Sequence, residues 1–355
     1  MLDGLDTKSH SYIGLILSLL FQNRSLIHRK VLALSALTLL LAGCVSGANQ
    51  DLSSENLNGA ITKTTDNAII RVVATNTVLA DLTGNVGGEL VSLTSLVPAG
   101  ADIHTFQTTP NHSIQIGEAD LIISNGAGLD DFLIPVLTNA RAPGSVHIVA
   151  SIGLEPFLKS SEEATRHAEE AEQNAGHEHS EVDPHFWLDP TLAIHYVNRI
   201  IEGLTKTDPK NSQQYAKNGK AYVEQLRQLD REIAETLAQI PPSSRHLVTF
   251  HDAYGYFARR YEWEVSSLVP SDASDVTPGD IVSIIDQINL EETPAVFAEP
   301  QLNSDVLRQA SQDAGVEVGI IRLLVDDQTL TYVDMMRHNA RSLVESLGST
   351  RGYYR

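Results

Sequence analysis

Two series of short β-rich runs, each alternating with helical patterns, constrain the fold of this chain most strongly. The first series has β-rich runs at 68–75, 90–97, 120–124 and 146–150, with helical patterns near 77–87, 111–118 and 128–140. The second has β-rich runs at 246–250, 264–270, 294–298 and 316–322, and ends in a helical pattern at 329–347. Such alternation predicts parallel sheets covered by helices on both faces.

A longer helical pattern separates the two series and begins at Pro209. Its apolar residues recur at helical spacing: Tyr215, Tyr222, Leu226, Leu229, Ile233, Leu237 and Ile240. At 1.5 Å per residue this helix would extend roughly 45 Å, the scale of a whole domain. We therefore expect an α/β protein of two lobes, 68–208 and 242–355, joined by one long rigid helix at 209–241.

Short matches indicate that the second lobe repeats the first. Leu96-Val97-Pro98 corresponds to Leu268-Val269-Pro270 at an offset of 172 residues, and Thr109-Pro110 corresponds to Thr277-Pro278 at an offset of 168. Near-constant offsets suggest a duplicated lobe. Two such lobes would leave a cleft between them, faced by loops at the carboxyl ends of both sheets.

The N-terminal region has the parts of an export signal. His28-Arg29-Lys30 precedes the apolar run Val31 to Leu41, and Ala42-Gly43-Cys44 follows. Leu41-Ala42-Gly43-Cys44 resembles the bacterial lipobox, which implies removal of residues 1–43 and a lipid on the Cys44 sulfur. The alternative, a buried structural cysteine, is disfavoured because Cys44 is the only cysteine and lies beside the expected cleavage point. Residues 44–67 are then expected to form a flexible tether.

Charge is concentrated in an acidic loop at 160–182, within the first lobe. This loop carries His167, His177 and His179 among many glutamates. It is either a secondary metal-binding loop or a solvated acidic loop with no metal role. The net charge of the whole chain is −20, which argues against nucleic acid as a partner and fits the attraction of cations.

Four polar residues fall in loops that follow β-rich runs or precede a helix. They are His104, His185, His251 and Asp326. Three imidazoles and a carboxylate suit zinc in tetrahedral geometry. Their spacings match no local metal motif, and for any one of these histidines alone a structural role would be the simpler interpretation.

Other residues carry weaker indications. Glu299 follows a β-rich run and could support a metal ligand, or serve as a structural carboxylate. Phe186 and Trp187 are expected to be packing residues that fix the His185 loop. The remaining histidines with no identified partner are interpreted as structural or exposed: His112, His147, His195, His246 and His338.

Four stretches together resemble the metal-binding lipoproteins that serve bacterial zinc and manganese ABC importers as solute-binding components (cluster A-I). They are Pro98 to Phe106, Asp183 to Pro190, Phe250 to Phe257 and Val296 to Gln301. The resemblance covers residues 68 to 350. It implies that His104, His185 and His251 are metal ligands and that Asp326, or the adjacent Asp327, completes the set.

The resemblance also implies a function, a location and a partner for the protein. Such a protein is not an enzyme: it would capture zinc outside the cytoplasm as a lipid-anchored monomer and deliver it to an ABC permease. Manganese-type members tend to have Glu where this chain has His251, and a third imidazole favours zinc, so manganese is the alternative cargo. An alternative of another class is a zinc hydrolase, with Glu299 or Asp252 as general base.

Replacement of Cys44 tests the anchor. If the sulfur carries the lipid, Cys44→Ala should release the protein from the membrane fraction or leave it unprocessed. Cell fractionation and the mass of the mature N-terminus measure this outcome. Normal membrane retention of the variant would contradict lipidation.

Overall fold

The computed structural model describes residues 69–157, 182–269, 293–302 and 305–348, together with positions 282, 285, 286 and 288–290. The chain divides into two compact units, Met1–Thr64 and Thr65–Arg355, and all described residues belong to the second unit. The predicted signal peptide, Cys44, the tether and the loop histidines His167, His177 and His179 lie outside the described residues.

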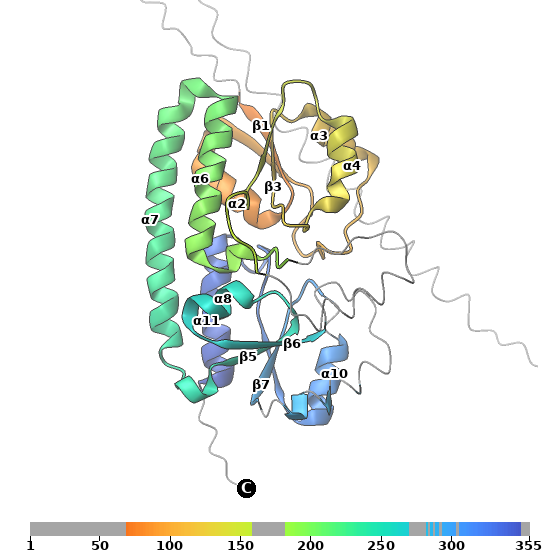
Figure 1. Cartoon of the computed structure of the whole chain (residues 1–355), viewed down its shortest axis with the longest axis vertical. Coiled ribbons are helices and arrows are strands. Elements are labelled where there is room, and N and C mark those ends of the chain that lie inside the picture. The colour runs from red at the N-terminus through yellow and green to blue at the C-terminus, as the bar shows by residue number, and fades with distance from the viewer. Residues whose placement is uncertain are drawn as a thin grey trace, which may run out of the picture. The chain divides into compact units, whose positions relative to one another are not determined.

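The first lobe contains a four-stranded parallel sheet of order β2-β1-β3-β4 (Figure 1). Its strands are β1 (Ile70–Ala74), β2 (Val91–Ser95), β3 (Leu121–Ser124) and β4 (Val146–Val149). Its α-helices are α2 (Thr77–Gly87), α3 (Pro110–Glu118), α4 (Ile134–Ala140) and α6 (Pro190–Thr207). Short 3-10 turns are found at Gly88–Leu90, Asp131–Leu133 and Phe186–Leu188.

The second lobe repeats this plan with a parallel sheet of order β6-β5-β7-β8. Its strands are β5 (His246–His251), β6 (Glu264–Val269), β7 (Ala295–Ala298) and β8 (Glu317–Ile320). The helices described here are α8 (Gly255–Tyr261), α10 (Asp305–Ala314) and α11 (Tyr332–Leu347). In each sheet the second strand pairs with one side of the first strand and the third strand pairs with the other. The prediction of two similar parallel α/β lobes is therefore confirmed.

Both sheets are buried on both faces, as the continuous apolar runs in their strands predict. On β1 and β3, Val72 and Leu121 point into the main core, whereas Val73 and Ile122 point into a second cluster beneath α3 and α4. On β7, Phe297 belongs to the main core and its neighbours pack toward α10. Because successive side chains of a strand point to opposite faces, each sheet contributes to two apolar cores.

Helix α7 (Ser212–Leu237) runs alongside both sheets and packs against α2 and α6 of the first lobe and α11 of the second (Figure 1). Its buried stripe contains the residues expected from the sequence, among them Tyr215, Leu226 and Ile233. It begins three residues later than predicted, because Pro209 opens a separate 3-10 turn, Pro209–Asn211. A further 3-10 turn, Pro242–Ser244, precedes β5.

The predicted helix at 128–140 is the largest departure from the sequence pattern. Residues 126, 127 and 128 adopt left-handed backbone angles, with φ of 82°, 54° and 85°, which an α-helix cannot continue. The chain instead forms the 3-10 turn Asp131–Leu133 and then α4, with Pro135 in its first turn. Among the described helices, none combines the length and apolar character needed to cross a membrane.

A close contact between β7 and β8 yields a stability test. Gly319 pairs with Phe297, and a β carbon on Gly319 would lie only 2.4 Å from Phe297 Cε1 and 2.6 Å from Cδ1. Because the Phe297 ring is fully buried, Gly319→Val should lower the free energy of unfolding by about 1–3 kcal/mol. Thermal denaturation measures the loss. Glu317→Val, at the exposed first residue of the same strand, is the control, and equal stability of the two variants would contradict the overpacking argument.

Candidate metal centre

Three imidazoles from distant parts of the chain converge on one point. His104 lies in the loop between β2 and α3, His185 immediately precedes the 3-10 turn Phe186–Leu188, and His251 is the last residue of β5. The ring centroids are 5.7 Å apart for His104 and His185, 5.6 Å for His104 and His251, and 5.5 Å for His185 and His251. One nitrogen from each ring lies within 4.8 Å of the other two, which is the arrangement of a group able to hold a metal ion.

His185 is oriented by Asp183, two residues before it. The Asp183 Oδ1 atom lies 2.8 Å from His185 Nδ1 and accepts the backbone N–H of His185 at 2.9 Å. A carboxylate on Nδ1 favours the neutral tautomer whose lone pair is on Nε2. Asp189 then begins α6 by accepting the N–H of Thr191 at 2.7 Å, with Pro190 as the first helical residue, as its sequence predicts.

His251 has a carboxylate partner from another strand. Glu299, directly after β7, places Oε1 at 3.1 Å from His251 Nδ1. Burial raises the pKa of Glu299 above its ordinary value, and the adjacent His251 offsets this only in part. Among the described residues, neither His251 Nε2 nor Glu299 Oε2 has a hydrogen-bond partner, although both atoms are buried. Buried polar atoms in this state are expected where a ligand binds.

His104 is the most accessible of the three histidines. Its backbone N–H donates to Asp102 Oδ1 at 2.9 Å, and Thr105 Oγ1 donates to Asp102 Oδ2 at 3.0 Å. Ile103, which is buried, anchors the loop to the main core. The His104 loop is thus shaped by a short local turn around one aspartate.

Asp326, expected as the fourth ligand, is not part of the group of potential ligand atoms that the described residues bring together. Its Oδ2 accepts Arg322 Nε at 2.8 Å, and its Oδ1 accepts the N–H and hydroxyl of Thr329 at 2.8 Å and 2.9 Å. Burial alone would raise the pKa of Asp326, but the bonds from Arg322 and Thr329 hold it below its usual value. The adjacent Asp327 is exposed.

Arg322 is itself fixed by α11. The Arg322 N–H donates to Asn339 Oδ1 at 2.8 Å, and Asn339 Nδ2 donates back to the Arg322 carbonyl at 2.8 Å. Its guanidinium group also contacts His338. The Arg322 and Asp326 pair is therefore a supported ion pair and not an incidental surface contact.

The loop after β3 was not identified from the sequence, yet it supports His185. Asn125 Nδ2 donates to the Pro184 carbonyl at 3.0 Å, and its Oδ1 accepts the Tyr196 hydroxyl at 2.8 Å. Asp130 holds this loop by accepting the backbone N–H of Gly126 at 3.0 Å and the Thr75 hydroxyl at 2.9 Å. Its one sequence indication is a polar pair, Ser124 and Asn125, at the carboxyl end of a buried strand.

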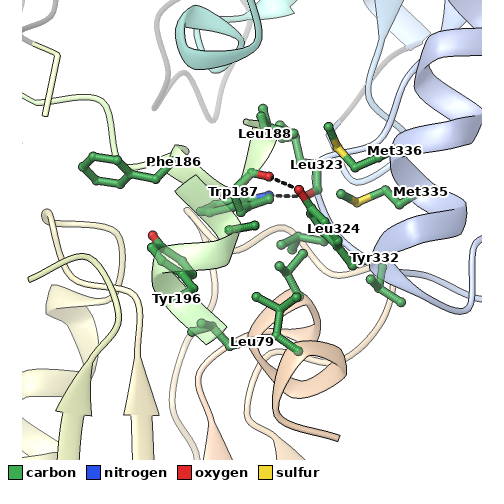
Figure 2. Packing of buried hydrophobic residues seen from close by; sticks show 14 of the residues in the cluster. Leu79, Phe186, Trp187, Leu188, Tyr196, Leu323, Leu324, Tyr332, Met335 and Met336 are labelled. Carbon is green, nitrogen blue, oxygen red and sulfur yellow. Dashed lines mark hydrogen bonds between the residues drawn. The ribbon is translucent and has the colours of Figure 1, made fainter. Parts of the chain in front are cut away.

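The aromatic residues and the other histidines that we expected to be structural pack or form hydrogen bonds within the fold. Phe186 and Trp187 are each 1% exposed and lie among the buried apolar residues of the main core (Figure 2). The Trp187 ring lies edge-on to His185, with centroids 5.3 Å apart. The other histidines have partners within the fold: Ser124 for His147, Ile152 O for His195, Ser266 for His246, Ile320 O for His338 and Thr109 N for His112.

Known proteins with similar sequences or structures bind metals. The chain is 29% identical over 322 residues to the manganese-binding lipoprotein MntA of Halalkalibacterium halodurans, covering 88% of this chain and 95% of that protein. It is 28% identical to the manganese ABC transporter substrate-binding lipoprotein PsaA of Streptococcus pneumoniae, covering 88% and 96%. The periplasmic zinc binding protein TroA of Treponema pallidum superposes with a TM-score of 0.66 at 29% identity, over 78% of this chain and 99% of TroA.

The family model for the zinc-uptake complex component A, periplasmic, matches residues 72–346. The family and these relatives are substrate-binding proteins of ABC transporters and not enzymes, so the zinc hydrolase alternative is wrong. The chain belongs to the ZnuA family of metal-binding components of ABC importers.

Proposed function

We propose that this protein captures zinc outside the cytoplasm through His104, His185 and His251 and delivers it to an ABC permease. The observation that carries the choice of zinc is the donor set: the gathered ligand atoms are three imidazole nitrogens. Imidazole is a preferred ligand of zinc, whereas manganese favours oxygen ligands and higher coordination numbers.

Manganese is the second candidate, because MntA and PsaA are named for manganese binding. A manganese site would need more oxygen, and Asp326 and Glu299 are the carboxylates available to supply it. Asp326 is held by Arg322 and Thr329 outside the group of gathered ligand atoms, so it could coordinate only if its carboxylate moved toward the histidines. We retain Asp326 as the proposed fourth ligand under that condition, with Asp327 as the alternative.

The proposal extends to the location of the protein. We propose that Cys44 is lipidated and that the protein acts as a monomer tethered to the extracytoplasmic face of a membrane. We also propose that His167, His177 and His179 form a secondary site that gathers ions for the main one. The lipoprotein names of MntA and PsaA support this localisation.

Metal titration tests the main site. Purified protein should bind one zinc ion, and the melting temperature should rise more with zinc than with manganese. A ligand at a hundred times its dissociation constant stabilises a protein by about 2.7 kcal/mol, which thermal denaturation detects readily. Because imidazoles bind metal only when neutral, the rise should shrink as pH falls through about 6.

Substitutions then assign the ligands within the same experiment. His104→Ala, His185→Ala and His251→Ala should each remove most of the zinc-dependent rise, and His251→Glu should shift preference toward manganese. His195→Ala is the control, because its Nε2 contacts the Ile152 carbonyl, away from the cluster. Equal stabilisation of the parent by both metals, or full zinc binding after two of the three ligand substitutions, would refute the assignment.

Glu299 gives an independent prediction. A carboxylate that orients a metal-bound imidazole typically contributes 10–100-fold to affinity, so Glu299→Gln should weaken zinc binding by about that factor. Gln keeps the shape of the side chain but loses its charge. Competition with a chromophoric chelator measures the change, with Glu264→Gln, exposed on β6, as the control. Unchanged affinity in Glu299→Gln would show that this carboxylate is only structural.

A further inference from the structure

The segment that carries His185, residues 183–188, belongs to the first lobe in sequence and is bonded there to Asn125, but it is also bonded to the second lobe. Tyr256 of α8 donates its hydroxyl to the Asp183 carbonyl at 2.8 Å. The Tyr256 ring also stacks on Phe186, with centroids 4.6 Å apart. The beginning of the segment is therefore attached to the lobe that supplies His251.

The end of the segment is attached to the same lobe through Trp187. Its indole Nε1 donates to the Leu323 carbonyl at 2.7 Å, and the Tyr332 hydroxyl donates to the Trp187 carbonyl at 2.7 Å (Figure 2). Trp187 is 1% exposed and Tyr332 is fully buried. Both hydrogen bonds are thus shielded from water. In such a buried environment, a donor or acceptor that loses its partner costs free energy.

Tyr332 is held firmly enough to position its partner. It is the first residue of α11, and its backbone N–H donates to Asp81 Oδ2 of α2 at 3.0 Å. Its ring packs in the main core with Leu324 and Met335 (Figure 2). Tyr332 therefore provides a fixed point to which the Trp187 backbone is bonded.

The link from Trp187 to the imidazole is short. Trp187 follows His185 by two residues in the 3-10 turn that His185 precedes, and the Leu188 N–H donates to the His185 carbonyl at 3.1 Å. The indole ring also lies against the His185 ring. A displacement of Trp187 would consequently rotate or shift the imidazole of His185.

We propose that Trp187 and Tyr332 are positioning residues, which dock the His185 segment onto the second lobe so that His185 and His251 form a preassembled pair of ligands. This inference rests on the proposed metal-binding role of the histidines. Ligands held in place before the ion arrives bind it with less loss of conformational freedom. His104, from the first lobe, then completes the site.

A double-mutant cycle tests the link between Tyr332 and His185. Tyr332→Phe is made in the parent, in His104→Ala and in His185→Ala, and affinities for zinc and for manganese are measured by chelator competition. We expect about a tenfold loss in the parent and a similar loss in His104→Ala, where the His185 and His251 pair remains. In His185→Ala, Tyr332→Phe should cause no further loss. Purely structural damage would lower affinity in every background.

Two further variants make the result decisive. Tyr215→Phe removes another buried tyrosine hydroxyl, bonded to Asp208 at 2.8 Å, and should leave affinity unchanged. Trp187→Phe removes the indole N–H bond to Leu323 together with part of the buried ring volume, and it replaces Tyr332→Phe if that variant does not fold. Cobalt absorption spectra should change in Tyr332→Phe and not in Tyr215→Phe.

The possible failures are distinguishable. Absence of zinc binding with retained manganese binding would overturn the zinc assignment, and the cycle would then be interpreted with manganese. Metal binding in the parent with equal losses in all three backgrounds, or with no loss in any, would overturn the positioning role alone.

Discussion

The apolar core that α7 shares with α2, α6 and α11 fixes the two sheets relative to each other, and the histidine cluster depends on it. This core is continuous between the lobes, because Leu79 and Trp187 of the first belong to the same cluster as Leu323 and Met335 of the second. Protein interiors are close-packed and resist deformation. Loops from separate lobes can therefore hold imidazoles at defined separations, as a metal site requires.

The carboxylates around the buried histidines determine the electrostatics of the cluster. A divalent cation among neutral imidazoles brings two charges that nitrogen lone pairs do not neutralise. In the proposed site, the Asp183 carboxyl lies one hydrogen bond from His185 and the Glu299 carboxyl one hydrogen bond from His251, where each would strengthen its imidazole as a ligand without occupying the site. Arg322, by contrast, already compensates the Asp326 carboxylate. With the carboxylates placed in this way, the ligand atoms gathered at one point are the three imidazole nitrogens.

Much of the fold was predictable from apolar periodicity, because strands buried on both faces and amphipathic helices have different repeats. The strands and α7 lie close to their predicted ranges for this reason. The predicted helix at 128–140 was partly wrong, since left-handed angles at Gly126 to Gly128 depend on the turn after β3 and not on hydrophobicity. The pairing of Asp326 with Arg322 was equally unpredictable from the sequence, because it depends on how α11 packs.

By itself, the sequence determined the alternation of strands and helices, the duplicated plan and the three histidines that follow or precede these elements. Those features are local, because they depend on residue type and on spacing along the chain. Only the tertiary structure decided which groups orient each imidazole. His251 and Glu299 are 48 residues apart, and Trp187 and Tyr332 are 145 apart. Hydrogen bonds over such separations exist only after the core has packed, so no local pattern encodes them.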